Sequence, residues 1–214
     1  MRPLPRLLAL TDDRVAALDD LGVRAAAIAA AGPAVALVAR LPSGSTDQLA
    51  ALAQRFVALA APPMAMVLVT GRADVAMAVG AHGVILRKDD LSVATVRQLL
   101  ACHPDMIVLR SVHSFAEANA AVQDGADGVI AGSIWPSATH PDCAAAGTGM
   151  LEQVVSLGVA TYAIGGVTPA RAIEARAAGA WGVAVISAGW DAANAYQAAM
   201  ELVQSWSDPA RHSG

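Results

Sequence analysis

The sequence predicts an α/β protein built as a single (β/α)8 TIM barrel. Short apolar runs alternate along the chain with longer, alanine-rich stretches of helical pattern. Three junctions between a helical stretch and the next apolar run share a Gly-Ala-x-Gly-Val motif, which begins at Gly80, Gly125 and Gly179. The first glycine of the motif suits a left-handed helix end, and the second suits the start of a tightly packed strand. Alternating units of this kind build a parallel sheet, and eight of them close into a barrel.

The apolar runs and helical patterns supply eight strands and eight helices. The predicted strands lie near residues 7–10, 34–39, 64–69, 83–86, 106–110, 128–131, 160–164 and 182–186. The predicted helices lie near residues 15–31, 46–59, 72–79, 93–101, 115–123, 150–156, 170–178 and 192–206. Asp12 and Asp13 are of a residue type that caps a helix, and Pro169 suits a first helical turn. We expect one barrel domain over residues 1–207 and a polar tail over 208–214.

Composition and charge argue against several classes of partner. The formal net charge is −4 and the chain has only 14 Lys and Arg residues, so no basic surface for nucleic acid is expected. No apolar run approaches the roughly 20 residues of a membrane-spanning helix, and the amino terminus lacks a signal-peptide pattern. The alanines at residues 25–31 indicate close helix packing, within the barrel or across a homodimer. We expect a cytoplasmic protein that binds neither nucleic acid nor a membrane.

Functional residues of such barrels lie on the loops that leave the carboxyl ends of the strands. Gly165 and Gly166 follow the seventh predicted strand, and Ile186 and Ser187 close the eighth. Glycine lets an anion approach the backbone closely, and a helix N-terminus adds the positive end of its dipole. The two neighbouring segments therefore predict a site for a small phosphorylated ligand. The long irregular segment 133–149, after the sixth strand, is the predicted functional loop.

Seven segments of the chain carry a resemblance to a known family. They are residues 11–13, 74–76 with 79–84 and 86, 90–91, 111–114, 125–127, 163–167 and 184–187. Their order and spacing, over nearly the whole chain, resemble the superfamily of thiamine phosphate synthase and TenI-type thiazole tautomerase. The resemblance implies a barrel that binds thiazole phosphate on Gly165, Gly166, Ile186 and Ser187.

The synthases of this family join the thiazole phosphate to a pyrimidine pyrophosphate with Mg²⁺, and this chain keeps only part of their pattern. Arg40 alone remains of a Gln-x-Arg-x-Lys segment after the second strand. Thr70-Gly71 replaces an Asn-Asp pair whose Asp ligates the metal, which leaves Asp90 as the one matched metal carboxylate. A single carboxylate makes a poor Mg²⁺ site. Arg87-Lys88 replaces a Gly-Gln pair and would offer cations from another direction.

The segment after the sixth strand bears on both classes of enzyme. The synthases have a Thr-x-Thr-Lys pattern here, and the matching residues of this chain are Ser137, Thr139 and His140. An imidazole therefore replaces the lysine that faces pyrophosphate. The tautomerase moves a proton within a carboxythiazole phosphate without a metal, and its histidine would stand at Ser133. Histidine suits proton transfer near neutral pH, and the chain offers His140 or His113 in its place.

We expect a TenI-like isomerase that requires no cofactor and uses His140 or His113 as its proton carrier. A solvated or structural role is the alternative for either histidine. The predicted substrate-binding residues are Arg40, Ser111, Ser133, Ser137 and Thr139. Two other functions stay open: a thiamine phosphate synthase with Mg²⁺ at Asp90, and a catalytically degenerate paralogue that binds a phosphorylated ligand. The identity of the ring and the oligomeric state also stay open.

Overall fold

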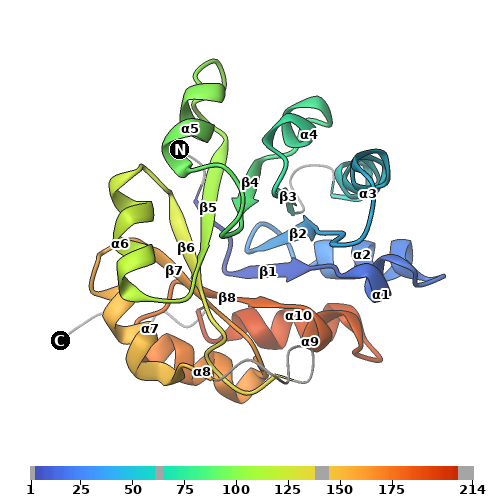
Figure 1. Ribbon diagram of the computed structural model, residues 1–214. Helices are drawn as coiled ribbons and strands as arrows, with labels where there is room; N and C mark the ends of the chain where they lie inside the picture. Colours follow the sequence, from blue (N-terminus) through green and yellow to red (C-terminus); the bar gives the residue numbers. More distant parts are fainter. Residues whose placement is uncertain (1–2, 61–64, 138–144, 207–214) are drawn as a thin grey trace.

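The chain forms a closed barrel of eight parallel strands in a computed structural model that describes residues 3–60, 65–137 and 145–206. Each strand pairs with the next one along the chain, and β8 pairs with β1 (Figure 1). The strands are β1 (Leu7–Leu10), β2 (Val35–Ala39), β3 (Met66–Thr70), β4 (Gly83–Leu86), β5 (Ile107–Val112), β6 (Gly128–Ala131), β7 (Ala160–Ile164) and β8 (Gly182–Val185). The predicted (β/α)8 barrel is therefore confirmed.

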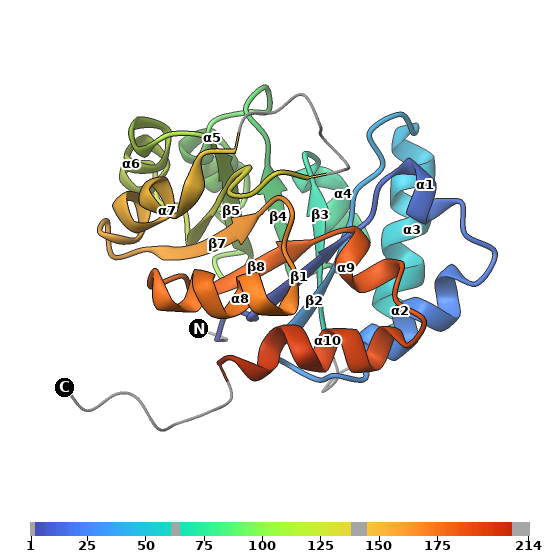
Figure 2. The same ribbon diagram turned by 90° about the horizontal axis from the view of Figure 1, so that it is seen from below.

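Helices surround the strands in chain order (Figures 1 and 2). They are α1 (Asp13–Ala16), α2 (Leu21–Ala29), α3 (Thr46–Leu59), α4 (Ala73–Ala78), α5 (Val93–Leu99), α6 (Phe115–Gln123), α7 (Gly147–Val155), α8 (Pro169–Ala177), α9 (Ser187–Trp190) and α10 (Ala195–Gln204). Because α10 packs against both α8 and α2, it closes the helical layer. Across the described ranges, no helix is long and apolar enough to span a membrane.

Two apolar layers hold the barrel together, because successive side chains of a strand point to opposite faces. In β1, Leu8 and Leu10 belong to the interior cluster, whereas Leu7 and Ala9 pack beneath the helices. The same alternation runs through the other strands, so each strand has a known set of inward positions. This alternation decides which residues reach the mouth of the barrel.

Side-chain caps set several of the helix boundaries. In α3 the Ser45 hydroxyl accepts a hydrogen bond from the Gln48 N–H, and the Gln48 side chain accepts one from the Ser45 N–H. This capping box starts the helix where the sequence predicts. Asp12 accepts from the Val15 N–H at 2.7 Å, which confirms its expected role as a cap.

The structure divides one expected helix and shortens another. The helix expected over residues 15–31 is divided, because α1 ends at Ala16 and α2 begins at Leu21. The helix expected over 192–206 begins later, at Ala195, where Asn194 caps the Gln197 N–H at 3.0 Å, and the separate turn α9 precedes it. The residues of these turns keep helical spacing of apolar positions, so periodicity alone does not reveal the breaks.

The amino-terminal end of the barrel is closed by aromatic side chains. The Tyr162 hydroxyl, inside the barrel, donates to the Pro5 carbonyl at 2.7 Å, and burial raises the pKa of Tyr162. The Arg6 guanidinium lies 3.6 Å from the centre of the Trp181 ring and donates to the Trp181 carbonyl. These contacts stabilise the end of the barrel opposite to the predicted site.

Candidate active site at the carboxyl ends of the strands

The mouth of the barrel gathers inward-facing residues at the carboxyl ends of four neighbouring strands. The last residues of β2 to β5 that belong to the interior apolar cluster are Val38, Leu68, Ile85 and Leu109. Positions two residues further along share the same inward register. They are Arg40, Thr70, Arg87 and Ser111. The fold therefore brings two arginines and two hydroxyls together on one side of the mouth.

Arg40 is half-buried at the end of β2. Its N–H donates to Thr11 Oγ1 at 2.9 Å, and that hydroxyl donates to the Arg40 carbonyl at 2.7 Å, which holds the end of the strand. Burial lowers the pKa of Arg40; the carboxylates of Asp12 and Asp13 act against this shift, and the charge of Arg87 adds to it. Among the described residues, no carboxylate forms an ion pair with the Arg40 guanidinium. It is therefore available to an anionic ligand.

Thr70 is a site residue that the sequence marks only as a departure from the family pattern. It ends β3 at 7% exposure, and its Oγ1 has no hydrogen-bond partner within the described ranges. An unpaired buried hydroxyl costs about 1–3 kcal/mol, which a ligand that pairs with it would remove. The signal that could have identified Thr70 is the two-residue alternation of β3.

Asp90 forms an ion pair with Arg87 across the turn after β4, and three hydrogen bonds join the two residues. Its Oδ2 accepts from the Arg87 backbone N–H at 2.6 Å and from Nε at 3.2 Å, while Oδ1 accepts from Nη2 at 3.0 Å. The Asp90 side chain is 11% exposed and that of Arg87 is 53% exposed. Hydrogen bonding to Asp90 raises the pKa of Arg87.

The donor set around Asp90 does not fit a divalent cation. Mg²⁺ is bound by carboxylate oxygens, but both oxygens of Asp90 already accept hydrogen bonds from a guanidinium. Residue 71 is glycine, and the described residues contain no group of three His, Cys, Asp or Glu side chains that could hold a metal. A metal at Asp90 would first have to break the pair and would then be repelled by Arg87. The Mg²⁺ expectation for Asp90 therefore lacks support from the residues around it.

Gly165 and Gly166 form a turn after β7 in which a side chain would not fit. Their φ angles are +96° and +63°. An ideal Cβ would lie 2.0 Å from Ser133 Oγ at Gly165, and 2.2 Å from the Pro136 carbonyl oxygen at Gly166. Arg171 Nη1 donates to the Gly166 carbonyl at 2.6 Å. The N–H groups of the two glycines donate to no described residue, so they are available to an anion.

The start of α9 lies next to this glycine turn, because β7 and β8 pair with Ile164 opposite Ala184. The Ile186 carbonyl accepts from the N–H groups of Gly189 and Trp190, and Ser187 is exposed. The Ser187 N–H donates to no described residue. The structure thus brings the four residues predicted to bind phosphate together, and their role stays a prediction.

His113 follows β5 and is exposed. Its Nδ1 lies 2.5 Å from the Gly132 carbonyl oxygen; since a carbonyl only accepts, Nδ1 carries the proton. Its backbone N–H donates to Glu117 Oε2 at 2.7 Å. These contacts agree with the structural alternative for His113. His140 and Thr139 lie outside the described residues.

The loop after β6 is tied together at its base. The Ser133 carbonyl accepts from the Ala146 N–H at 2.8 Å, and the Ile134 carbonyl accepts from the Gly147 N–H at 3.0 Å. Because α7 begins at Gly147, the irregular segment is shorter than the predicted 133–149. Ser137 is half-buried in the described part of this loop.

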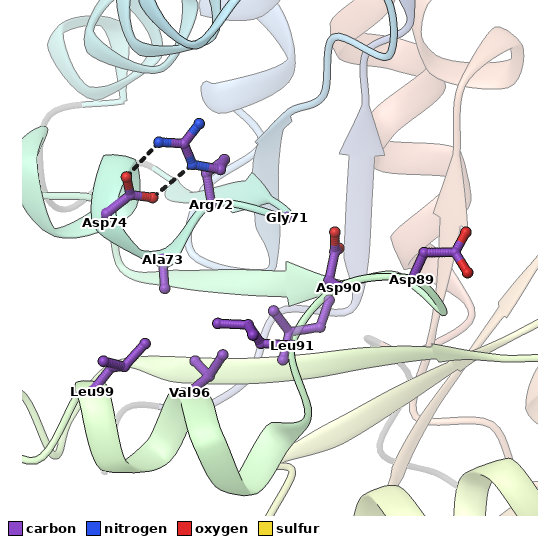
Figure 3. Close-up of a pocket in the computed structure, with 10 residues that line it drawn as sticks. Gly71, Arg72, Ala73, Asp74, Asp89, Asp90, Leu91, Val96 and Leu99 are labelled. Carbon is purple, nitrogen blue, oxygen red and sulfur yellow. Dashed lines mark hydrogen bonds and ion pairs between the residues drawn. The ribbon is translucent and has the colours of Figure 1, made fainter.

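A hollow of about 400 Å³ lies between the start of α4 and α5 (Figure 3). One wall is apolar and consists of Leu91, Val96 and Leu99. On the other wall Arg72 pairs with Asp74. The hollow borders Gly71 and Asp90 but none of the residues predicted to bind phosphate, so it lies beside the mouth of the barrel rather than at its centre.

Comparisons with known proteins agree with the sequence resemblance. A family model described as Thiamine monophosphate synthase matches residues 7–188. A curated thiamine-phosphate synthase of Salinispora arenicola is 37% identical over 211 residues, covering 96% of this chain and 99% of the relative. Another, of Chloroflexus aurantiacus, is 41% identical over 125 residues, and the match spans 56% of each protein. The chain thus aligns with only about half the length of that second relative.

Solved structures extend the comparison to the fold. A thiamine phosphate pyrophosphorylase from Pyrococcus furiosus superposes with a TM-score of 0.79 at 30% identity, covering 94% of this chain and 95% of the other. A 3-hexulose-6-phosphate synthase, with a TM-score of 0.66 at 19% identity, shares the fold alone.

The main functional expectation from the sequence is corrected by these relatives. They are named synthases, and one of them is 37% identical over 96% of this chain. The expectation of a TenI-like isomerase is therefore wrong, and the comparisons favour the synthase alternative.

Proposed function

This chain belongs to the thiamine monophosphate synthase family, and on that premise we propose that it is a transferase that joins a pyrimidine pyrophosphate to a thiazole phosphate. The observation that carries the proposal is the 37% identity to a thiamine-phosphate synthase across 96% of the chain. The arrangement of the mouth adds support, because cations follow β2 and β4, while the backbone N–H groups that follow β7 and β8 have no acceptor among the described residues.

The proposal divides the mouth between two small phosphorylated heterocycles. The thiazole phosphate is assigned to Gly165, Gly166, Ile186 and Ser187. The remaining substrate contacts are assigned to Arg40, Ser111, Ser133, Ser137 and Thr139. The inward register of Arg40 and Ser111 supports binding of the pyrophosphate over β2 to β5. A homodimer and the absence of nucleic acid as a partner stay predictions.

The chemistry requires positive charge near the pyrophosphate. A carbon–nitrogen bond forms to the thiazole ring while the bond between the pyrimidine's methylene carbon and the pyrophosphate oxygen breaks. The pyrophosphate leaves with the bonding electrons, so negative charge grows on its oxygens, and fixed cations nearby stabilise the transition state. Arg40 and Arg87 are the arginines with inward register at the carboxyl ends of the described strands. His140, at the position of the family's lysine, is a further proposed contact from outside the described part.

The test mixes the purified protein with the two substrates and follows thiamine phosphate and released pyrophosphate, with and without Mg²⁺. We expect both products in equal amounts, and a loss of turnover in Ser111→Ala. The matched control is Arg55→Gln, which alters an exposed arginine of α3. Binding of the thiazole phosphate without any product would refute the transferase and leave the binding paralogue as the function.

A further inference from the structure

The Arg87–Asp90 pair fills the space that a side chain on residue 71 would need. An ideal Cβ on Gly71 would lie 3.1 Å from Arg87 Nη2 and 3.2 Å from Asp90 Oδ2. Figure 3 shows Asp90 and Gly71 on adjacent segments at the edge of the hollow. A side chain at residue 71 would therefore crowd the guanidinium in this position, and the pair would have to shift to admit it. Glycine at residue 71 thus leaves room for the Arg87–Asp90 pair.

Hydrogen bonds within the protein hold Arg87 in place. Three hydrogen bonds join it to Asp90, and the turn that carries both residues is held by Arg110. Arg110 donates from Nη1 to the Leu91 carbonyl at 2.9 Å and from Nη2 to the Lys88 carbonyl at 3.1 Å. Arg87 Nη1 donates to no described residue, and the side chain is 53% exposed. A fixed guanidinium with free N–H groups loses little entropy when it binds a phosphate group.

Two further groups complete an anion site beside Arg87. Arg40 shares its inward register and forms no ion pair within the described part. The Thr70 hydroxyl, at the end of the strand between them, is buried and unpaired among described residues. A diphosphate group would accept hydrogen bonds from both arginines and from the hydroxyl. None of these contacts requires a carboxylate to be free for a metal.

We propose that the Arg87 guanidinium, held on Asp90, takes the place of a divalent cation, so that this mouth binds a diphosphate anion through Arg87, Arg40 and Thr70 without metal. The inference rests on the proposed function for the identity of the natural substrate. Its anion-binding part is independent of that function.

The experiment titrates inorganic pyrophosphate into the full-length protein by calorimetry in the presence of EDTA. We expect saturable binding by the wild type, a loss of affinity of about tenfold or more in Arg87→Gln, and no change in Arg55→Gln. Arg87→Lys keeps the charge but not the forked guanidinium that pairs with Asp90, so its affinity for pyrophosphate should lie between those of the wild type and Arg87→Gln. Circular dichroism and thermal melting establish that each variant is folded.

Two results would overturn the inference. One is binding of pyrophosphate only when Mg²⁺ is added; the other is wild-type affinity of Arg87→Gln in EDTA. The synthase assay separates this inference from the proposed function. Metal-free binding that depends on Arg87, without thiamine phosphate formation, would refute only the function. Turnover and pyrophosphate binding that both require Mg²⁺ would refute only the anion site.

Discussion

Replacing Gly165 by alanine should destabilise the barrel beyond the ordinary effect of adding a side chain to a left-handed turn. The φ angle at Gly165 is +96°, and an added Cβ would meet three atoms of Ser133. Gly125 is the matched control, because its φ is +90° and its Cβ would meet nothing within 4 Å. Comparing the two variants separates the loss of stability caused by the contact with Ser133 from the loss caused by the left-handed backbone conformation.

The magnitude follows from these two parts. An alanine in the left-handed region costs roughly 1–2 kcal/mol, and this applies to both variants. At Gly165 the Cβ would also lie 2.8 Å from Ser133 Cβ and 2.9 Å from its Cα, so backbone must move and hydroxyl rotation is not enough. Overpacking of this kind adds about 1–3 kcal/mol. The expected loss is thus about 2–5 kcal/mol for Gly165→Ala and about 1–2 kcal/mol for Gly125→Ala.

Urea unfolding and thermal melting of the two variants measure this difference. For a domain of this size each kcal/mol lowers the melting temperature by roughly 2–4 °C, so Gly165→Ala should melt well below Gly125→Ala. Thiazole phosphate binding should also weaken in Gly165→Ala, because the moved turn carries the N–H groups assigned to phosphate. Equal destabilisation of the two variants would refute the contact with Ser133 as the reason for glycine at this position.

Three further outcomes are expected. Arg40→Gln should weaken pyrophosphate binding by about tenfold or more in calorimetry without lowering the melting temperature; unchanged affinity would remove Arg40 from the site. His113→Ala should cost about 1 kcal/mol in urea unfolding, because the Gly132 carbonyl loses its donor, with little effect on turnover. A large loss of turnover at unchanged stability would instead assign His113 to proton transfer. Hydrogen bonding to Arg72 lowers the pKa of Asp74. At pH values above the ordinary aspartate pKa, this exposed pair should therefore add about 0.2–1 kcal/mol to the free energy of unfolding. That contribution is lost as the pH falls through the folded-state pKa, so the unfolding free energies of Asp74→Asn and the wild type should differ at neutral pH and converge in acid.

Local patterns were sufficient to predict the fold and part of the candidate site. The strand alternation and the glycine junctions are properties of a few neighbouring residues, so they can be read before the chain is folded. The turn at Gly165 and Gly166 is also a local feature, because it depends on two glycines directly after a strand, and both have positive φ angles. The breaks within residues 15–31 and before Ala195 were not predictable in this way, since apolar periodicity continues through both turns.

The sequence by itself determined the order of strands and helices, the family resemblance, and the residues that replace the family's metal-binding pattern. Only the tertiary structure decided what those replacements do together. Arg87 pairs with Asp90 in the space above Gly71, and Arg110 holds the turn that carries them. Arg40 and Thr70 join them through the register of β2, β3 and β4. Strand register is set by packing across the whole barrel. These charged and polar side chains are therefore brought together only when the barrel closes.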